Sequence, residues 1–300
     1  MKTFLTGATG YVGGSIAVAL LAAGHRVVGL ARSADAGPAL RELGVEPVFG
    51  TLDDADLLAE QARAADVVVN AASSDHAASV AVFLDALAGS GKAYVQTSGA
   101  GVVADKARGA APVRPVLSDD DEFTPEPEKA ARAALDRSIL AAAGRGIRTV
   151  VVCPTLIYGH GLGLRRDSYQ VPQLIGLARR DGVPGHVGEG LNVWSAVHVE
   201  DLADLYVLLV EKGEAGTFLY AENGEASFAD VAAAIGRALG QEAPPRPLDF
   251  AAATELWGEG AATFTMSSNV RVRADRARSL GWAPSRPSVL DWIAAEVRQD

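Results

Sequence analysis

Three glycines near the amino terminus stand where a chain could bind a phosphate group. Gly7, Gly10 and Gly13 lie in TGATGYVGG, directly after the apolar run Lys2 to Thr6 and at the start of a helical pattern. In this arrangement the first glycine permits a tight turn, the second lets a pyrophosphate approach the backbone, and the third lets helix and strand pack closely. The helix amides then face the phosphates. The spacing predicts a dinucleotide site, with further contacts from Thr6, Thr9, Tyr11 and Val12.

The end of the second apolar run bears on which dinucleotide binds. The run Arg26 to Ala31 ends in alanine, where an NAD-preferring site usually carries an acid that bonds the ribose hydroxyls. Arg32 and Ser33 follow, and an arginine here can pair with a 2′-phosphate without a neighbouring acid to repel it. We therefore predict NADP(H) as the preferred cofactor, with NAD(H) as the alternative. A solvated surface charge is the other interpretation of Arg32.

The elements that must position these residues alternate between two patterns through the first half of the chain. Short β-branched or apolar runs are separated by helical stretches, which indicates βαβ units around a parallel sheet. The predicted strands are Lys2–Thr6, Arg26–Ala31, Glu46–Phe49, Asp66–Asn70, Ala93–Thr97 and Arg148–Cys153. In the helix that starts near Pro127, the spacing of Ala131, Leu135 and Ile139 predicts the face that packs on the core.

The expected fold class is α/β, a doubly wound Rossmann-type parallel sheet followed by a smaller carboxy-terminal domain. Residues 1–155 form the expected dinucleotide-binding domain. Residues 156–300 form the substrate-side domain, with the segment 194–212 returning to the main sheet. The loops GHGLG at 159–163 and GVPGHVGEG at 182–190 are expected to contact substrate.

Composition excludes several classes of protein. Cys153 is the only cysteine, so neither an intrachain disulfide nor a thiolate zinc site can form. The net charge is −10, and the basic residues are dispersed among acids, which argues against nucleic acid or an anionic membrane as partner. No apolar run reaches the roughly 20 residues that span a bilayer. We expect a soluble cytoplasmic protein without a metal, in which the acidic run Asp119–Glu122 is a solvated loop.

Five segments carry a family resemblance: TGATGYVGG, DVVVNAA at 66–72, YVQTSGA at 94–100, CPTLIYG at 153–159 and VHVEDLA at 197–203. In order and spacing they resemble the short-chain dehydrogenase/reductase superfamily, in its extended and atypical branches of the NAD-dependent epimerase/dehydratase type. The resemblance implies a structural anchor at His198 and a homodimer. It also implies cofactor contacts at Leu52, Ala71, Ala72, Ser73, Thr97, Pro154 and Thr155.

The chain departs from that family at the catalytic pair. Such enzymes usually carry a tyrosine and a lysine four residues apart on the helix after strand five, where the lysine lowers the pKa of the tyrosine. Alignment on Asp136 places Glu128 and Arg132 at these positions, and a one-turn slip offers Pro125 and Lys129. Arg132 could hold the nicotinamide ribose or an anionic substrate, and Glu128 could donate a proton. A surface ion pair between Glu128 and Arg132 is the alternative.

Other side chains could supply the acid or base. Ser98 is the preferred counterpart of the substrate-binding hydroxyl of the family, with Thr97 as the alternative. Tyr158 is a catalytic candidate or a packed residue, and Tyr169 and His160 follow in the next loop. Asp75 and His76 fall at the ligand-binding edge of the sheet, where Asp75 is expected to cap the next helix.

Three functions are consistent with these residues. The first is an NADP(H)-dependent oxidoreductase that acts on a small carbonyl or alcohol. The second is a nucleotide-sugar epimerase or dehydratase that retains NAD, against which stand the missing catalytic pair and the missing ribose acid. The third is a non-catalytic dinucleotide-binding regulator.

Overall fold

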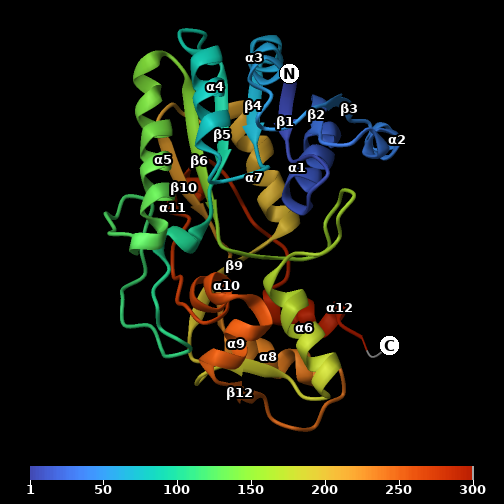
Figure 1. Cartoon of the computed structure of the whole chain (residues 1–300), viewed down its shortest axis with the longest axis vertical. Helices are drawn as coiled ribbons and strands as arrows, with labels where there is room; N and C mark the ends of the chain where they lie inside the picture. The colour runs from blue at the N-terminus through green and yellow to red at the C-terminus, as the bar shows by residue number, and fades with distance from the viewer. Residues whose placement is uncertain (299–300) are drawn as a thin grey trace.

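The main sheet contains seven parallel strands in the order β10-β6-β5-β4-β1-β2-β3 (Figure 1). The computed structural model describes residues 1–298. The strands are β1 (Lys2–Thr6), β2 (Arg26–Ala31), β3 (Glu46–Phe49), β4 (Val67–Asn70), β5 (Ala93–Thr97), β6 (Arg148–Pro154) and β10 (Thr217–Ala221). All six predicted strands are confirmed. The seventh, β10, was not predicted, and it pairs with β6 at the edge of the sheet.

Helices cover both faces of this sheet because its strands bury alternate side chains on opposite sides. Leu5 packs with α1 (Tyr11–Ala22) and α7 (Val199–Lys212). Its neighbour Phe4 points to the other face, in the cluster that holds α3 (Ala55–Ala64), α4 (Ala77–Leu87) and α5 (Ala130–Ala141). The short α2 (Gly37–Glu42) precedes β3. This is the doubly wound arrangement that the sequence predicted.

The buried face of α5 differs from the predicted one. Ala133, Asp136 and Ile139 are buried, whereas Ala131 is exposed and Leu135 is half-buried. The stripe predicted through Ala131 was wrong because a spacing of four residues drifts around a helix of 3.6 residues per turn. Because Asp136 lies on the buried face of α5, its carboxyl group faces the sheet.

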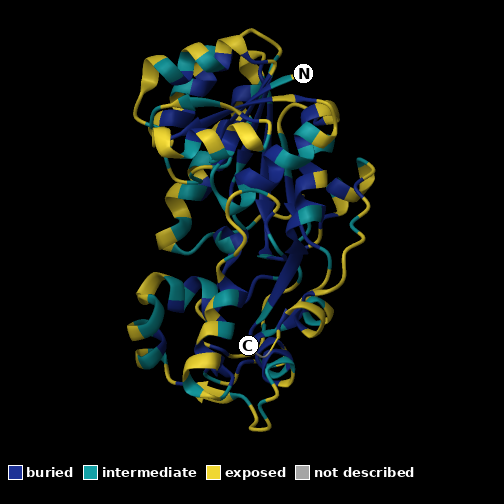
Figure 2. Cartoon of the chain, turned by 90° about the vertical axis from the view of Figure 1, so that its right-hand side faces the viewer, coloured by how far each residue is buried: buried dark blue, intermediate teal, exposed yellow. Residues whose placement is uncertain are grey.

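The second half of the chain has its own core and two small sheets. One sheet has the order β11 (Glu225–Ser227), β9 (Val193–His198) and β7 (Leu156–Tyr158), and β12 (Arg246–Leu248) pairs with β8 (Gly185–Val187). The helices around them are α6 (Gln170–Asp181), α8 (Phe228–Ala238), α9 (Phe250–Trp257), α10 (Glu259–Ala261) and α12 (Val289–Glu296), whereas α11 (Asp275–Ser279) packs against β10 of the main sheet. Figure 2 shows buried residues concentrated in both halves of the elongated molecule.

The segment 194–212 divides between the two halves. Its helix, α7, packs on the main sheet against α1, but β9 lies in the small sheet between β7 and β11. Apolar strands of similar composition fit either sheet, so the pattern WSAVHV did not reveal which partner it would take.

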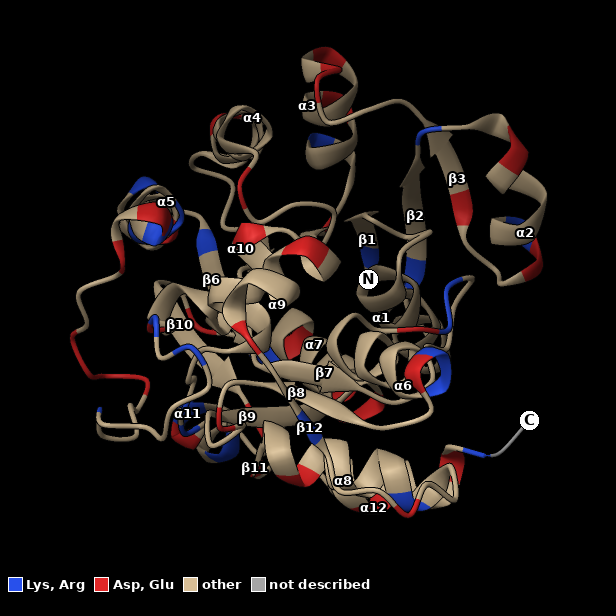
Figure 3. Cartoon of the chain, turned by 60° about the horizontal axis from the view of Figure 1, so that its bottom comes forward, with Lys and Arg blue, Asp and Glu red and all other residues tan. Residues whose placement is uncertain are grey.

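Charged residues of both signs are dispersed over the elements (Figure 3). Within residues 1–298 no cluster of acidic, histidine or cysteine side chains is arranged to hold a metal ion. In the same range, none of the helices has the length and hydropathy needed to cross a bilayer.

Candidate cofactor and active site

The glycine loop between β1 and α1 makes contacts that no other residue type allows. Gly7 has a φ of +78°, and a Cβ atom there would lie 2.7 Å from the carbonyl oxygen of Ala71. A Cβ on Gly13 would lie 2.2 Å from the carbonyl oxygen of Gly7. The amide of Gly10 donates to that same oxygen at 2.8 Å. The loop thus makes the tight turn and the close helix contact that a phosphate-binding loop requires.

A cavity of about 310 Å³ opens beside this loop. Its predicted lining residues are Gly7, Thr9, Gly10, Arg32, Leu52, Ala71 and Ala72, and the structure adds Leu30, Thr51 and Arg165. At the entrance to α1 no side chain caps the helix, and its first turn carries no acid. The first-turn amides and the positive end of the helix dipole are therefore available to an anion. These residues fit the pyrophosphate of a dinucleotide.

Two arginines line the cavity without a partner of their own. Within the described part of the chain, neither Arg32 nor Arg165 makes a hydrogen bond or ion pair through its side chain. Both are exposed. An unpaired guanidinium beside a phosphate-sized cavity is a ready donor to a phosphate group. Arg165 was not predicted, since it lies just beyond the GHGLG loop at 159–163 that was expected to contact substrate.

The loop that carries Arg165 lies directly against α1 (Figure 1). The phenol of Tyr11 donates to the carbonyl oxygen of Gly159 at 2.9 Å, and the amide of Leu162 donates to Ser15 Oγ at 3.1 Å. Gly163 approaches Gly14 so closely that a Cβ there would lie 2.7 Å from the Cα of Gly14. Burial raises the pKa of Tyr11 well above its usual value, so the phenol keeps the proton that it donates.

Several predicted cofactor contacts lie outside the cavity. Thr6 is fully buried behind it, where its hydroxyl donates to Asn70 and accepts from the amide of Ala72 at 3.3 Å. Ser33 caps a short helical turn by accepting from the amide of Asp35. The remaining residues that do not line it are Tyr11, Val12, Gly13, Ser73, Thr97, Arg132, Pro154 and Thr155.

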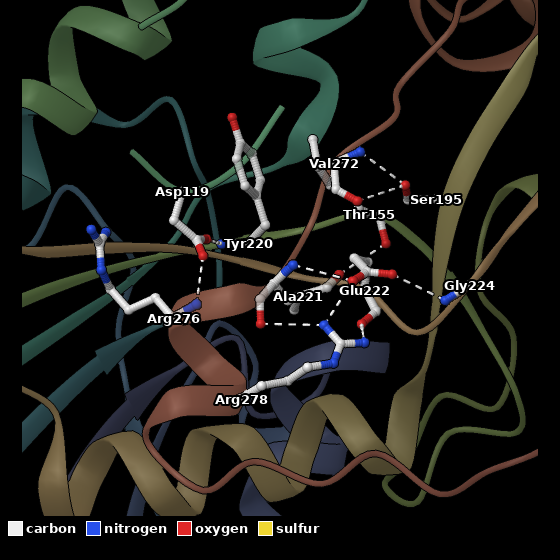
Figure 4. Close-up of polar contacts among 11 residues, drawn as sticks. Asp119, Thr155, Ser195, Tyr220, Ala221, Glu222, Gly224, Val272, Arg276 and Arg278 are labelled. Atoms are coloured by element: carbon white, nitrogen blue, oxygen red, sulfur yellow. Dashed lines mark hydrogen bonds and ion pairs between the residues drawn. The ribbon is translucent and has the colours of Figure 1, made fainter. Parts of the chain in front are cut away.

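Pro154 and Thr155 lie at the end of β6, where β6 meets β10. The hydroxyl of Thr155 donates to the carbonyl oxygen of Ala221 at 2.9 Å. Next to this bond, the buried carboxylate of Glu222 accepts from the amide of Gly224 and from Arg278 (Figure 4). The hydroxyl of Thr155 is thus engaged in holding this end of the sheet together.

The two hydroxyls at the end of β5 point to different helices. Thr97 shares a hydrogen bond of 2.6 Å with the phenol of Tyr206 on α7. Ser98 Oγ donates to Asp136 Oδ2 on α5, also at 2.6 Å. Successive residues of an extended chain point to opposite sides, so only Ser98 faces α5.

Arg132 and Glu128 do not pair with each other as the alternative interpretation supposed. Arg132 binds Asp75 through two hydrogen bonds, of which Nε to Oδ1 measures 2.7 Å. Glu128 instead accepts from Lys106 at 2.7 Å. Glu128 lies in the tighter helical turn Pro127–Lys129 that directly precedes α5, whereas Arg132 lies within α5 itself, so the two are not on one regular α-helix. Arg132 Nη1 would lie 3.5 Å from a Cβ on Gly99, which places the guanidinium beside the end of β5.

The predicted cap of α4 was also wrong. His76, not Asp75, accepts from the amide of Ser79, while the carboxylate of Asp75 is engaged by Arg132. That pairing lowers the pKa of Asp75 below its usual value.

The remaining candidates have structural partners. Tyr158 is fully buried, and its hydroxyl donates to the carbonyl oxygen of Pro287 at 2.6 Å, which argues against a catalytic role. His160 lies 3.5 Å from Glu296, and Tyr169 is exposed where α6 begins. His198 accepts from the amide of Glu200 at the start of α7, as an architectural residue would.

Comparison with known proteins places this geometry in a family. Residues 3–219 match the model of the NAD dependent epimerase/dehydratase family. An oxidase of an Acremonium species is 31% identical, over 100% of this chain and 97% of the oxidase. The 4-hydroxy-2-methyl-3-oxo-4-farnesyl-3,4-dihydroquinoline-1-oxide ketoreductase of Stigmatella aurantiaca is also 31% identical, over 75% of this chain and 69% of the ketoreductase.

The fold has counterparts among solved structures. The dTDP-glucose 4,6-dehydratase of Bacillus anthracis in complex with NAD superposes with a TM-score of 0.79. The two are 16% identical, and the match covers 99% of this chain and 95% of the dehydratase. The chain therefore belongs to the NAD-dependent epimerase/dehydratase family, in the extended branch of the short-chain dehydrogenase/reductase superfamily that its motifs resemble.

Proposed function

We propose that this chain is an NADP(H)-dependent oxidoreductase that acts on a small carbonyl or alcohol. The observation that carries the proposal is the cavity beside the glycine loop, which two unpaired guanidinium groups line. One is Arg32, directly after Ala31, which stands where an NAD-preferring site usually carries the acid that bonds the ribose hydroxyls. A 2′-phosphate carries negative charge, which an arginine can neutralise through two charge-assisted hydrogen bonds. The ribose hydroxyl of NAD(H) is neutral and gains less from an arginine.

The positions of the side chains suggest which part of the cofactor or substrate each one contacts. The glycine loop and Arg165 hold the phosphates, and Arg32 holds the 2′-phosphate. Ser98 and Arg132, at the carboxyl edge of β5 and beside it, face the reacting group. When bound, the dinucleotide supplies or accepts a hydride. The protein contributes orientation and a route for the accompanying proton.

The substrate class is inferred from relatives. The ketoreductase of Stigmatella aurantiaca and the oxidase of Acremonium carry names of redox enzymes, and each covers most of this chain at 31% identity. On the alignment through Asp136, Glu128 and Arg132 stand where sugar epimerases of the fold usually carry a tyrosine and a lysine, and the alternative alignment with Pro125 and Lys129 also lacks the tyrosine. The names of the relatives support a reductase, and the missing tyrosine weighs against an epimerase.

Binding and turnover test the proposal together. We expect the purified protein to bind NADPH more tightly than NADH by at least about tenfold, as charge-assisted hydrogen bonds of about 1.5–3 kcal/mol require. Fluorescence titration measures both affinities. A panel of ketones, quinones and imines, followed by loss of NADPH absorbance, then measures turnover.

Three results contradict the proposal. Stoichiometric NAD that copurifies and does not exchange indicates the epimerase. Equal affinity for the two dinucleotides removes the NADP(H) preference. NADPH that binds but is never consumed by the panel indicates the regulator.

A further inference from the structure

The buried carboxyl group of Asp136 forms a hydrogen bond with the hydroxyl of Ser98 at the end of β5. Ser98 Oγ lies 2.6 Å from Asp136 Oδ2, and the two residues are 6% and 4% exposed. The other carboxyl oxygen, Oδ1, is buried and has no hydrogen-bond partner among the described residues. A buried carboxylate with an unpartnered oxygen is costly, and a proton on the group removes much of that cost. The surroundings of this carboxyl group therefore favour its protonated form.

Asp136 also lines a cavity on the side of α5 away from the glycine loop. The cavity has a volume of about 350 Å³, and its other walls come from α5, from Phe218 before the end of β10 and from residues 119–123. Asp121, Glu122 and Arg137 are exposed, so the cavity opens to solvent. Water in the cavity can thus exchange protons with a residue that is itself bonded to Ser98.

The acidic run Asp119–Glu122 is solvated at Asp120, Asp121 and Glu122, as the sequence predicted, but not at Asp119. Asp119 is buried, and its carboxylate accepts from the amides of Tyr220 at 2.6 Å and Arg276 at 2.7 Å (Figure 4). These bonds hold the loop against β10 and α11, because they satisfy amides that would otherwise be buried without an acceptor. The loop is therefore a fixed wall of the cavity.

We propose that Ser98 and Asp136 are the proton-transfer pair of this enzyme, in place of the usual tyrosine and lysine. The inference rests on the proposed reductase function. With a reduced dinucleotide bound, the carbonyl carbon would gain a hydride from it, and the carbonyl oxygen would take the hydroxyl proton of Ser98. Ser98 Oγ takes the proton of the Asp136 carboxyl group, and water in the cavity returns a proton to Asp136. The net change is one hydride and one proton added across the C=O bond.

The charges around Asp136 suit this role. Burial raises the pKa of Asp136 to about 6, against the hydrogen bond from Ser98 and the charges of Arg132 and Arg137, which lower it. Asp75 raises it further. Burial also raises the pKa of each neutral acid nearby on the sheet, so these groups keep their protons: Tyr94 on β5, Cys153 on β6 and Tyr220 on β10. The cavity wall contributes Asp119, Asp121 and Glu122.

Other donors offered by the sequence are engaged elsewhere. Glu128 is exposed and paired with Lys106, and an arginine such as Arg132 cannot release a proton near neutral pH. Lys129 is the competing candidate: its ammonium lies 4.5 Å from the centre of the Phe264 ring, and burial lowers its pKa. It therefore enters the test as a variant of its own.

A first measurement reads the pair without cofactor. The side-chain carboxyl carbons of ¹³C-labelled aspartate are titrated by NMR in the ligand-free protein, and the signal that disappears in Asp136→Asn is assigned to Asp136. We expect it to titrate near pH 6 and to shift to higher pH in Ser98→Ala, which removes a hydrogen bond that lowers its pKa. An apparent pKa near 4, or no shift in Ser98→Ala, overturns the proposal.

A second measurement reads the chemical step. Single-turnover reduction by the wild type should fall about tenfold per pH unit above pH 6, because Ser98 can give its proton to the carbonyl oxygen only as protonated Asp136 passes a proton to Ser98 in the same step. Asp136→Asn should lose at least about 100-fold in rate together with this pH dependence, at unchanged NADPH affinity. Asp136→Glu should restore part of both. Asp204→Asn on α7, another acid whose pKa burial raises, is the matched control and should behave as wild type.

The outcomes separate the two levels of inference. Wild-type protein that binds NADPH but reduces no substrate contradicts the reductase function, and the catalytic assignment of Ser98 and Asp136 falls with it. Turnover with an unchanged pH profile in Asp136→Asn leaves the reductase intact and overturns the proton pair. If Lys129→Met loses the pH dependence of the single-turnover rate while Asp136→Asn keeps it, Lys129 is the proton donor instead.

Discussion

Tyr11 and Gly159, 148 positions apart, are joined by a hydrogen bond of 2.9 Å from the phenol to the backbone carbonyl oxygen. The bond ties the first turn of α1 to the loop that follows β7. Because Arg165 lies a few residues further along this loop, the same contact brings a second guanidinium to the cavity beside Gly7 and Gly10. The dinucleotide site is thus assembled from both halves of the chain.

Replacing Tyr11 with Phe should loosen this loop while leaving the fold in place. A buried neutral hydrogen bond contributes about 1 kcal/mol, which corresponds to about a fivefold change in local opening. Trypsin cleavage after Arg165 and Arg166 in the free protein should accelerate by that factor, and NADPH affinity should fall. Tyr169→Phe, which changes an exposed phenol near the end of the same loop, is the control. Cleavage of Tyr11→Phe at the wild-type rate would show that the bond does not restrain the loop.

The two arginines of the cavity should contribute differently to binding. Arg32→Ala should weaken NADPH by about 10- to 150-fold, the value of a charge-assisted contact, and should leave NADH unchanged. Arg165→Ala should weaken NADPH by a similar factor. A parallel loss for NADH places Arg165 on the pyrophosphate, and no loss for NADH places it on the 2′-phosphate. Arg166→Ala, the neighbouring exposed arginine outside the cavity, controls for charge. Arg165→Ala with the affinities of Arg166→Ala would remove Arg165 from the site.

The sheet was predictable from sequence where its strands are flanked by helices. Runs such as Val67–Asn70 are buried on both faces, and this produces a continuous apolar signal bounded by turns. The edge strand β10 escaped prediction although it is similar in composition. It follows α7 in the chain, after the glycine-rich segments of the second half, and its pairing with β6 depends on contacts between distant residues.

The site was predictable to the extent that its signals are local. The glycines of the first loop can be recognised in the sequence because the requirements for a positive φ, close packing and phosphate approach all arise within a few neighbouring residues. Arg165 has no such signal, since contacts between distant residues, such as Tyr11 with Gly159 and Gly14 with Gly163, bring it to the cavity. Gly163, the last glycine of GHGLG, permits that close contact with Gly14. The bond between Ser98 and Asp136 likewise depends on how α5 is rotated against β5, which the misplaced stripe on α5 obscured.

The carboxylate of Glu222 should be a major contributor to stability at the end of β10. It is 1% exposed and accepts from Arg278 at 2.7 Å and from the amides of Gly224 and Ala274 (Figure 4). The Arg278 side chain is 37% exposed, so the pair is only half-buried, and loss of the charge-assisted hydrogen bonds to Glu222 should cost about 1.5–3 kcal/mol. Glu222→Gln should therefore lower the melting temperature by about 3–10 °C in calorimetry. Glu225→Gln, which breaks a partly exposed pair with Arg271, should cost no more than about 1 kcal/mol. Equal melting temperatures for the two variants would contradict this ranking.

The pair between Arg132 and Asp75 should make stability depend on pH in one direction. Arg132 lowers the pKa of Asp75 below 3.8, so the folded state favours the carboxylate more than the unfolded state does. This contribution is fully present above the unfolded value and is lost as pH falls through the folded one. Because the Asp75 side chain is 58% exposed, we expect only about 0.5–1 kcal/mol.

Melting temperatures of the wild type and Asp75→Asn test this expectation at pH 7 and at pH 3. The variant should melt lower at pH 7, and the gap should narrow at pH 3, where protonation weakens the pair in the wild type as well. Asp85→Asn, which removes a more exposed ion pair with Arg145, is the matched control and should show a smaller gap at pH 7. If the wild type and Asp75→Asn melt at the same temperature at pH 7, or if the difference between their melting temperatures grows on acidification, Arg132 does not stabilise the carboxylate of Asp75. Arg132 would then be free to meet a substrate or ribose directly, so the same measurement also decides how this guanidinium is held at the end of β5.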